Sequence, residues 1–456
     1  MRPSLDSLRQ RIIIATRRER TALAELVKLA WPIAAAMCGE TLLGLVDTKL
    51  VGGLGAAALG GVGVATTFMF LAYAMVWGIM RGVKVRASHA VGRGAGEDGV
   101  RYAQTGVVIG ALLGVVIAIA GRDVSPVLRL ARIDDSLIPY ARDFFAMVTL
   151  GAPATAVVAA LTQHRQAIGD SRTPMFVGIA GNVFNAVVAY ALIYGRFGLP
   201  ALGVRGGALG TAITEWLEAF AMLAILWRDA RAHARSTLGF RAALFEVLSL
   251  GVPTGLHFVG ELLAFTLFTV LIGGLGATEI AAHQLALATI RTSFLPGLAI
   301  SEAACVMVGR ALGAGSLPAA DRATSAAIKL AAGFMAACGI VFAVLGGTIA
   351  RVFTDDANVA HTAQRLLWVA AVFQVLDAVN IVLRGALRGA KDVRFAAVLG
   401  IAVVWTCVPT AAFVLGKLAH LGALGGWLGF VGETTVGAAV FWWRWRRGAW
   451  RATASV

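Results

Sequence analysis

The chain consists mainly of long apolar runs that are separated by short polar gaps. A helix needs roughly 20 consecutive apolar residues to cross the hydrocarbon core of a bilayer. Twelve runs of about that length can be traced, and the pattern therefore predicts twelve transmembrane helices with short connections. We expect them near residues 27–50, 59–82, 103–120, 139–161, 175–195, 206–227, 245–271, 279–307, 323–348, 363–384, 396–416 and 423–443.

The composition agrees with this pattern and leaves no room for a soluble domain of ordinary size. Of the 456 residues, 58% are hydrophobic and only 14% are charged, and the mean hydropathy is +0.78. A soluble domain is usually about 25% charged. We therefore predict an all-α membrane protein.

The formal net charge of +15 is placed in a way that does not favour nucleic acid as a partner. Lys and Arg occupy the gaps between the apolar runs, and alternate gaps hold far more of them than the others. The positive-inside rule then puts both termini in the cytoplasm, as expected for an even number of crossings of the plasma (inner) membrane. Residues 1–26 read as a basic cytoplasmic arm without a signal peptide, and residues 444–456 as a basic tail.

An internal repeat divides the chain into two halves. The stretch from Pro32 to Ala56 aligns without gaps with the stretch from Pro253 to Ala277, and eleven of the 25 positions are identical. Six helices is an even number, so both halves enter the membrane in the same orientation. We predict two pseudo-symmetric six-helix bundles, residues 1–228 and 229–456.

Acidic residues inside the apolar runs are the first candidates for function. A charge at the bilayer centre costs about 2.5–3.5 kcal/mol on insertion scales, and such residues usually face a cavity or a partner. Glu40 and Asp47 are seven residues apart and share one helix face. The complete set is Glu40, Asp47, Glu215, Glu218, Glu261, Glu302, Asp377 and Glu433.

Polar residues accompany two of these acids. His257 lies four residues before Glu261, within hydrogen-bonding reach on the same helix face. Gln374, Asp377 and Asn380 follow one another at spacings of three and form a polar stripe on an otherwise apolar helix. Such a stripe is typical of a cavity lining.

These acids favour a cation site. A carboxylate removed from water can hold a proton, and carboxylates with amide oxygens can hold a sodium ion. The alternative is a structural hydrogen bond between helices. We favour the cation site for Asp47, Glu261 and Asp377, with sodium as a candidate ligand of Glu261 and Asp377; the two interpretations stay open for Glu40 and the remaining acids.

A basic cluster, Arg81, Lys84 and Arg86, closes the second apolar run. These side chains are expected to snorkel to the cytoplasmic interface. The alternative is a cationic lip that receives anionic or zwitterionic substrates.

Enzyme motifs are missing from the sequence. The match to G-x-G-x-x-G at Gly94–Gly99 lies in a gap with no preceding strand, and no Lys is followed by Ser or Thr, which excludes a P-loop. Neither H-E-x-x-H nor G-x-S-x-G occurs. We predict that the protein is not an enzyme and uses no cofactor other than a coupling ion.

Several short stretches, in order and in both halves, carry a family resemblance. They are "LAWP" at Leu29–Pro32, "VDTKLVGGLGAAAL" at Val46–Leu59, "GDSRTP" at Gly169–Pro174, "LGVRGGALGTAI" at Leu202–Ile213, "AAHQLAL" at Ala281–Leu287 and "LRGAKD" at Leu387–Asp392. With them the chain resembles the multidrug and toxic compound extrusion (MATE) family over essentially its whole length. The resemblance implies two bundles around a central cleft.

The resemblance also implies functional residues. In the NorM-like branch, carboxylates of the first, seventh and tenth helices act in cation coupling, and they match Asp47, Glu261 and Asp377. The DinF-like branch pairs an acid of the first helix with an Asn and an Asp of the fifth. This chain keeps the Asn as Asn185 but has Ala189 in place of the Asp, so the NorM-like arrangement fits better. The residues expected to line the cavity or touch substrate are Glu40, Asn185, His257, His283, Gln284, Gln374 and Asn380.

We therefore expect a secondary antiporter that exports amphiphilic drugs or toxic organic compounds in exchange for protons or sodium ions. Its partners are a small amphiphilic substrate and the lipid bilayer, and a monomer supplies the whole pathway. An alternative in the same fold is a flippase or exporter of a lipid-linked or anionic metabolite. A non-transporting membrane scaffold is a third hypothesis.

Overall fold

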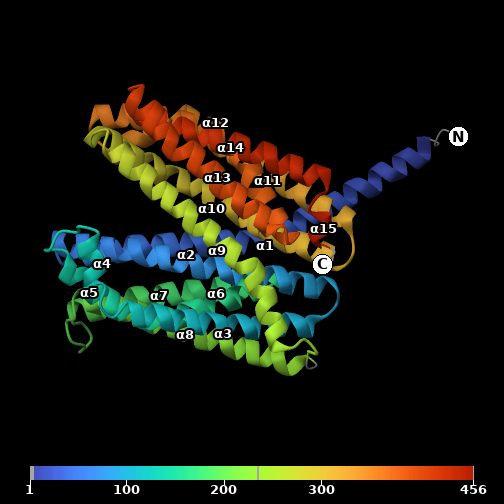
Figure 1. Cartoon of the computed structure of the whole chain (residues 1–456), viewed down its shortest axis with the longest axis horizontal. Helices are drawn as coiled ribbons and strands as arrows, with labels where there is room; N and C mark the ends of the chain where they lie inside the picture. The colour runs from blue at the N-terminus through green and yellow to red at the C-terminus, as the bar shows by residue number, and fades with distance from the viewer. Residues whose placement is uncertain (1–4, 234–235, 455–456) are drawn as a thin grey trace. The chain divides into compact units, whose positions relative to one another are not determined.

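The structure, a computed structural model, describes residues 5–233 and 236–454 and is built from helices (Figure 1). The elements are α1 Leu5–Gly52, α2 Ala56–Gly92, α3 Gly96–Ala120, α4 Ser125–Leu130, α5 Ile138–Val148, η1 Thr149–Gly151, α6 Ala152–Ala167, α7 Arg172–Tyr194, α8 Val204–Ala232, α9 Phe240–Gly273, α10 Ala277–Gly313, α11 Leu317–Phe353, α12 Ala357–Gly389, α13 Val393–Ala411, η2 Ala412–Leu418, α14 Gly422–Arg447 and α15 Arg451–Ala454.

The predicted all-α membrane fold is confirmed. Within the described residues, 12 helical segments are long and apolar enough to cross a membrane, and each contains one of the predicted runs almost entirely. The fourth span joins α5, η1 and α6, and the eleventh joins α13 to the π-helical turn η2. The first four residues of the predicted basic arm and the last two of the predicted tail lie outside the described residues; residues 5–26 of the arm continue into the first span as one helix.

The internal repeat reappears in the helix boundaries. Helix α1 ends at Gly52 and α2 begins at Ala56, while α9 ends at Gly273 and α10 begins at Ala277, so both boundaries recur at an offset of 221 residues. Both turns use a glycine at positive φ, +107° at Gly55 and +134° at Gly276, a region that other residues rarely occupy. The identical residues of the two halves therefore form turns with the same backbone conformation.

The helices group into two compact units. Unit 1 comprises residues 1–34 and 260–456, and unit 2 comprises residues 35–259. Both divisions fall inside a helix, in α1 and in α9. The predicted bundles at 1–228 and 229–456, and the cleft between them, stay predictions.

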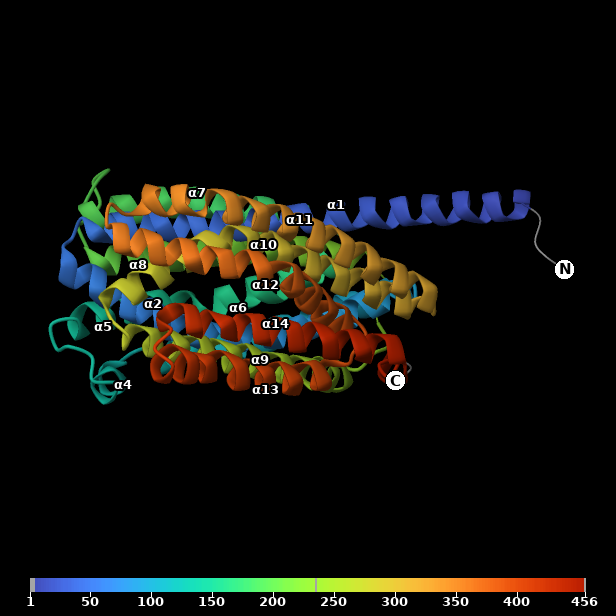
Figure 2. The ribbon, with the colours of Figure 1, turned by 90° about the horizontal axis from the view of Figure 1, so that it is seen from above.

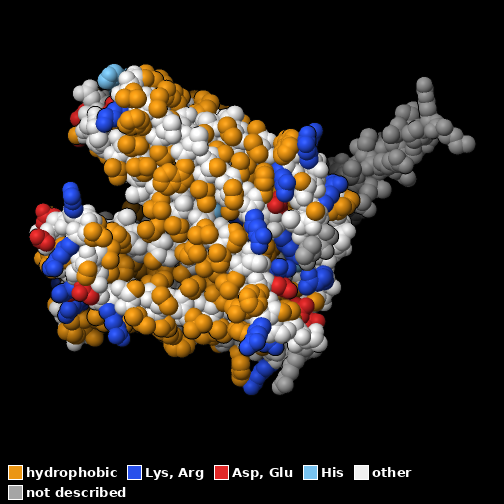
Figure 3. Space-filling model, viewed as in Figure 1, with side chains coloured by type: hydrophobic (Ala, Val, Ile, Leu, Met, Phe, Trp, Pro, Cys, Tyr) orange, Lys and Arg blue, Asp and Glu red, His pale blue; other side chains and the backbone are white. Residues whose placement is uncertain are grey.

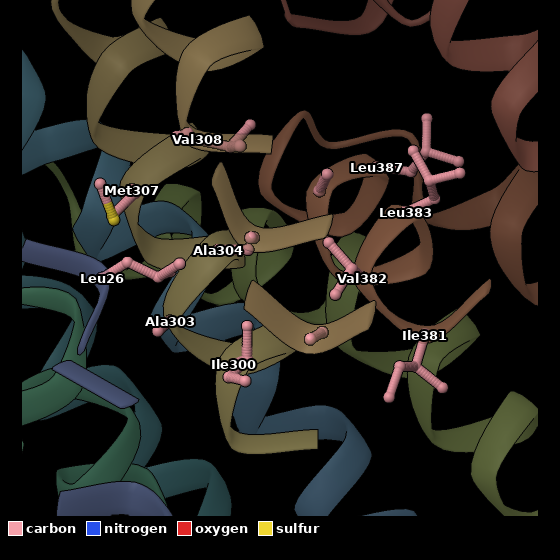
Figure 4. Packing of buried hydrophobic residues seen from close by; sticks show 14 of the residues in the cluster. Leu26, Ile300, Ala303, Ala304, Met307, Val308, Ile381, Val382, Leu383 and Leu387 are labelled. Atoms are coloured by element: carbon pink, nitrogen blue, oxygen red, sulfur yellow. The ribbon is translucent and has the colours of Figure 1, made fainter. Parts of the chain in front are cut away.

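Unit 1 is organised around α12, which packs against α10, α11 and α14 (Figures 1 and 2). One apolar cluster joins α1, α10 and α12, and Figure 4 shows side chains of α10 between Leu26 and the leucines of α12. A second cluster holds the aromatic residues Phe268, Phe373, Trp427 and Phe430. The centre of α12 is therefore enclosed on several sides, so its polar stripe lies inside unit 1.

Unit 2 packs its helices closely through glycines. In this unit, α3 lies against α6, α7 against α8, and α2 against α3, α5 and α6. A Cβ on Gly110 would lie 2.8 Å from the Ala156 carbonyl oxygen, and one on Gly78 would lie 2.5 Å from the Gly255 nitrogen. Small residues let backbones approach in this way in membrane bundles.

The surface of each unit shows how it is suited to lipid. Apolar side chains cover the middle of the visible face, whereas Lys and Arg gather toward the helix ends (Figure 3). Among the exposed apolar residues are Leu45 at 64%, Val183 at 64% and Val344 at 73%. Exposed leucine and valine at this density match a hydrocarbon environment better than water.

The first turn of α12 provides a test of the fold. The Asp356 carboxylate accepts hydrogen bonds from the backbone nitrogens of Asn358 at 2.8 Å and Val359 at 3.2 Å, and so caps the helix. Replacing such a cap by Ala typically costs about 1 kcal/mol. We expect Asp356→Ala to lower the unfolding temperature of the purified protein, measured by scanning fluorimetry, and the exposed Asp355→Ala to leave it unchanged. Equal losses in both variants would contradict the cap.

Candidate functional site

Unit 1 gathers acidic and amide side chains around the polar stripe of α12. We call Glu261 of α9, Asp377, Asn380 and Arg384 of α12, and Glu433 of α14 the unit 1 acid cluster. The Arg384 Nη1 donates to the Glu261 Oε1 at 3.2 Å, and the Asn380 Nδ2 donates to the Glu433 Oε1 at 3.2 Å. Asp377 also hydrogen-bonds with Asn380 and interacts electrostatically with Arg384 and Glu261. Three helices thus bring three carboxylates, one amide and one guanidinium together.

The cluster is removed from solvent. Asn380 is 1% exposed, Asp377 7% and Glu433 8%, and the Glu261 and Arg384 side chains are 19% and 13% exposed. Burying a charge is costly unless it is paired and hydrogen-bonded. Three acids face one permanent cation, and an added cation would improve the charge balance.

The helical period explains why these α12 residues converge. Asp377, Asn380 and Arg384 follow at spacings of three and four and so share a face. Opposite Asn380, α14 carries Gly437, where a Cβ would lie 2.5 Å from the Asn380 Oδ1. The glycine therefore leaves the space that the amide occupies.

One turn before Asp377, Gln374 continues the stripe. Its side chain is 1% exposed, and within residues 5–233 and 236–454 neither of its amide atoms has a hydrogen-bond partner. Buried polar atoms are normally paired. An unpaired amide beside an acid cluster is a feature of a ligand site.

A second acid cluster lies in unit 2. Glu40 of α1 and the α8 residues Glu215 and Glu218 interact electrostatically with one another. Tyr73 of α2 and Glu215 each hydrogen-bond with Thr155 of α6. Glu40 therefore lies near two other acids of unit 2. Its predicted role at the cavity stays a prediction.

The other predicted residues of unit 2 lie in α1, α7 and α9. Asp47 is half-buried in α1. Asn185 is 1% exposed, and its Nδ2 donates to the Thr211 Oγ1 at 3.2 Å, while its Oδ1 has no partner among the described residues. His257 is 9% exposed and packs edge-on against Phe258. Their predicted roles stay predictions.

His283 lies in the aromatic cluster of unit 1. The Trp427 Nε1 donates to its Nδ1 at 3.1 Å, and its Nε2 lies 3.3 Å from the Thr269 Oγ1. An Nδ1 that accepts places the ring proton of a neutral imidazole on Nε2. The ring is 0% exposed, whereas its neighbour Gln284 is exposed. The predicted cavity-lining roles of both residues stay predictions.

The basic cluster lies within α2, which continues to Gly92, and it does not snorkel as a group. Lys84 is 1% exposed, the Arg81 guanidinium lies 4.1 Å from the centre of the Phe258 ring, and Arg86 pairs with Glu246 at 3.4 Å. The expectation of snorkelling is therefore wrong for Lys84. Its alternative, a cationic lip for substrate, stays open.

Ion pairs and hydrogen bonds between side chains stabilise the loop between α6 and α7. Asp170 accepts from the Thr173 nitrogen at 3.0 Å and pairs with Arg165, which also binds Asp229. Burial acts to raise the pKa of Asp170, but hydrogen bonds from Thr173 and Arg165 outweigh it, so the net pKa is lowered. The "GDSRTP" stretch is therefore a structural loop.

Sequence reasoning missed Arg384 and left Glu433 open. Arg384 lies seven residues after Asp377, so the helical period places it on the same face. Glu433 could be recognised from the sequence only as an acid inside an apolar run, which did not indicate its partner. Its pairing with Asn380 joins residues 53 positions apart and needed the tertiary structure.

In the part of the chain that the structure describes, twelve membrane-length helical segments with acids buried among them define a multi-pass membrane protein with the features of a transporter. The MatE family matches residues 32–191 and 253–413. The chain belongs to the MatE family, whose members are transporters and not enzymes, as predicted. The two matched segments fall in the two predicted halves.

Relatives align over nearly the whole chain. The "Multidrug resistance protein NorM" of Burkholderia vietnamiensis is 32% identical over 428 residues, which cover 91% of this chain and 92% of that protein. The "Probable multidrug resistance protein NorM" of Burkholderia pseudomallei is 33% identical over 439 residues, 93% of this chain and 92% of that protein.

Solved structures share the fold. A MOP superfamily transporter from Pyrococcus furiosus superposes with a TM-score of 0.85 at 21% identity, covering 95% of this chain and 96% of that chain. An outward-facing multidrug resistance MATE family transporter gives 0.84 at 20% identity, with 95% and 96% coverage. These likenesses support the fold of the chain.

Proposed function

We propose that the protein is a secondary antiporter that exports amphiphilic drugs or toxic organic compounds in exchange for protons or sodium ions. The observation that carries the proposal is the unit 1 acid cluster, which buries three carboxylates against one guanidinium inside membrane-spanning helices. The multidrug resistance names of its NorM relatives support the choice of cargo.

The coupling cation is exchanged at acids in both units. Asp47 serves in unit 2, and Glu261 and Asp377 serve in unit 1. Bound substrate and bound cation favour different conformations, and this difference in affinity makes exchange possible. Polar side chains that contribute to the path are Glu40, Asn185, His257, His283, Gln284, Gln374 and Asn380.

The oligomeric state and the membrane orientation of the protein belong to the same proposal. It works as a monomer in the plasma (inner) membrane with both termini in the cytoplasm, because one chain carries both acid clusters and Lys and Arg predominate in the gaps on that side. It requires no cofactor besides the coupling ion.

A second candidate cargo is an anionic or lipid-linked metabolite. The observation in its favour is the concentration of three cationic side chains, Arg81, Lys84 and Arg86, in one short stretch of α2. A fold relative from Pyrococcus furiosus is described as having a binding pocket of reverse polarity that suggests a different function.

Transport in vesicles tests the proposal. Purified full-length protein is reconstituted in phospholipid vesicles, and the movement of a cationic dye is followed under a pH gradient or a sodium gradient that is imposed separately. We expect one of the two gradients to drive the dye against its own gradient. An anionic dye is the comparator. Movement of the anionic dye alone would support the second candidate, and movement of neither dye under either gradient would reject the export function.

A further inference from the structure

The last two turns of α14 expose two pairs of tryptophan and arginine. The Arg446 Cζ lies 5.0 Å from the centre of the Trp442 ring. The Arg447 Cζ lies 4.6 Å from the centre of the Trp443 ring. The members of each pair are four residues apart, so the helical period brings each guanidinium over its ring. The two rings are 41% and 48% exposed, and both arginines are exposed as well, so this helix end presents two rings and two cations on its outer surface.

The neighbouring Arg444 shows how these two arginines differ from one that is paired inside unit 1. The Arg444 Nε donates to the Asp392 Oδ2 at 2.8 Å. In the described part of the chain, by contrast, Arg446 and Arg447 form no ion pair. Residues 434–456 contain no Asp or Glu. The two exposed guanidiniums are therefore available to an anion from outside the chain.

The residues that follow α14 fold back and add a third cation at a defined place. Trp450 is 0% exposed and stacks on Trp445 with ring centres 4.4 Å apart, and its Nε1 donates to the Trp445 carbonyl oxygen at 3.0 Å. A Cβ on Gly448 would lie 3.0 Å from the Arg451 Nε. Arg451 is exposed and lies directly at the end of α14, where the buried tryptophan holds the chain. Groups that are fixed before binding lose less entropy when a ligand arrives.

The end of α8 in unit 2 carries a smaller version of this arrangement. Trp227 is 59% exposed, and the Arg231 Cζ lies 3.5 Å from the centre of its ring, again four residues along the helix. Only this one pair is present on α8 among the described residues, and Asp229 lies between its two members and is bound by Arg165. The end of α14 therefore carries more unpaired positive charge than its counterpart.

The chemistry of these side chains matches a phospholipid better than a free anion. The membrane-length segment of α14 ends at Arg447, so Trp442 and Trp443 lie in its last two turns, and tryptophan is enriched where a span meets the headgroups. Guanidiniums bind phosphate with two parallel hydrogen bonds. Clusters of Lys and Arg beside a span attract anionic lipids. Inorganic phosphate could contact only the arginines, whereas a lipid also offers glycerol and acyl carbons to the rings.

We propose that the end of α14 and the chain that follows it bind the headgroup of an anionic phospholipid. Arg446 and Arg447 hold the phosphate oxygens, and Arg451 adds positive charge beside them. The rings of Trp442 and Trp443 lie against the glycerol and the first acyl carbons of the same lipid. We call these five residues the α14 lipid site. The inference goes beyond the proposed function and does not depend on export or on the coupling ion.

Binding of single lipids to purified, delipidated full-length protein tests the inference. Phosphatidylglycerol or phosphatidylcholine with the same acyl chains is added in detergent, and native mass spectrometry gives the Kd of the first bound lipid. The tail variant is Arg446→Gln with Arg447→Gln. The matched control is Arg228→Gln with Arg231→Gln, which also removes two exposed positive charges from the end of a last helix, here α8. Inorganic phosphate serves as a competitor.

We expect the unaltered protein to bind phosphatidylglycerol more tightly than phosphatidylcholine, whose choline group balances the charge of its phosphate. The tail variant should bind phosphatidylglycerol about tenfold or more weakly, because each Arg near an anionic lipid surface contributes about fivefold. The control variant should keep the Kd of the unaltered protein. Inorganic phosphate at the concentration of the lipid should not displace it.

A second measurement reports on the same site in a bilayer. The unfolding temperature is recorded in nanodiscs of phosphatidylcholine with and without phosphatidylglycerol, because a lipid that binds the folded state stabilises it by mass action. We expect phosphatidylglycerol to raise the unfolding temperature of the unaltered protein and the control variant but not of the tail variant. The readout is the difference between the two lipid mixtures, so a loss of stability that is common to both cancels.

Three results would overturn the inference. The first is equal weakening in the tail and control variants, which would show attraction to positive charge anywhere on the surface. The second is a tail variant that binds phosphatidylglycerol as tightly as the unaltered protein and is stabilised by it equally. The third is displacement of the lipid by an equal concentration of inorganic phosphate, which would make the site one for a free anion.

Discussion

Asp377→Asn is expected to lower cation-driven dye export by about tenfold or more, because it removes the central carboxylate of the unit 1 acid cluster. Asp377 is 7% exposed, hydrogen-bonds with Asn380 and lies near Arg384. Coupling free energies between sites are typically about 1–3 kcal/mol, or about 5–150-fold in equilibrium terms. Asparagine preserves shape and hydrogen bonding but cannot exchange a proton or carry the charge that attracts sodium.

The measurement is dye efflux from loaded vesicles under the driving gradient, together with dye binding without a gradient. We expect the binding of dye to change little and the response to the gradient to disappear, since the lost group acts on the cation. Asp355→Asn is the matched control, because it makes the same chemical change at an exposed position just before α12. Efflux by Asp377→Asn at the rate of the control would remove Asp377 from the coupling site.

Gly78→Ala should produce the second large effect, a loss of folded unit 2. Gly78 of α2 faces α9, where a Cβ would lie 2.5 Å from the Gly255 nitrogen and 3.0 Å from the Thr254 carbonyl carbon. Both neighbours are backbone atoms in helices, so they cannot rotate away. Overpacking usually costs about 1–3 kcal/mol, and backbone contact of this kind belongs at the upper end.

Scanning fluorimetry and the yield of monodisperse protein measure this effect. Gly63→Ala is the control on the same helix, because a Cβ there would have no neighbour within 4 Å. Alanine in an open helical position should keep or slightly raise the unfolding temperature, since it restricts the unfolded chain. A Gly78→Ala protein as stable as Gly63→Ala would show that α2 and α9 can separate at no cost.

The membrane spans were predictable because their signal is local. Each span needs a continuous run of apolar residues of sufficient length, and both the length and the hydropathy of such a run are visible in the local sequence. The repeat was predictable for a related reason. The glycine-rich turns at Gly52–Ala56 and Gly273–Ala277 need positive φ at the same position. Glycine meets this requirement, and both halves therefore have the same residues there.

Part of the acid cluster was predictable as well. Gln374, Asp377 and Asn380 share a helix face at spacings of three, so the stripe on α12 follows from the helical period alone. The ion pair between Arg384 and Glu261 joins positions 123 residues apart, and no local pattern reports such a distance. For the same reason, the burial of Lys84 contradicted a prediction drawn only from its place at the end of an apolar run.

The amino-acid order by itself determined where the chain crosses the membrane, how its two halves correspond and which acids carry an insertion cost. Only the packing of α9, α12 and α14 decided that Glu261 receives the guanidinium and that Asp377 and Glu433 meet at one amide. The physical reason is that hydropathy and helical period act over a few residues, whereas the energy of a buried charge depends on the partner within a few ångströms of it. That partner is supplied by whichever helix the fold places alongside.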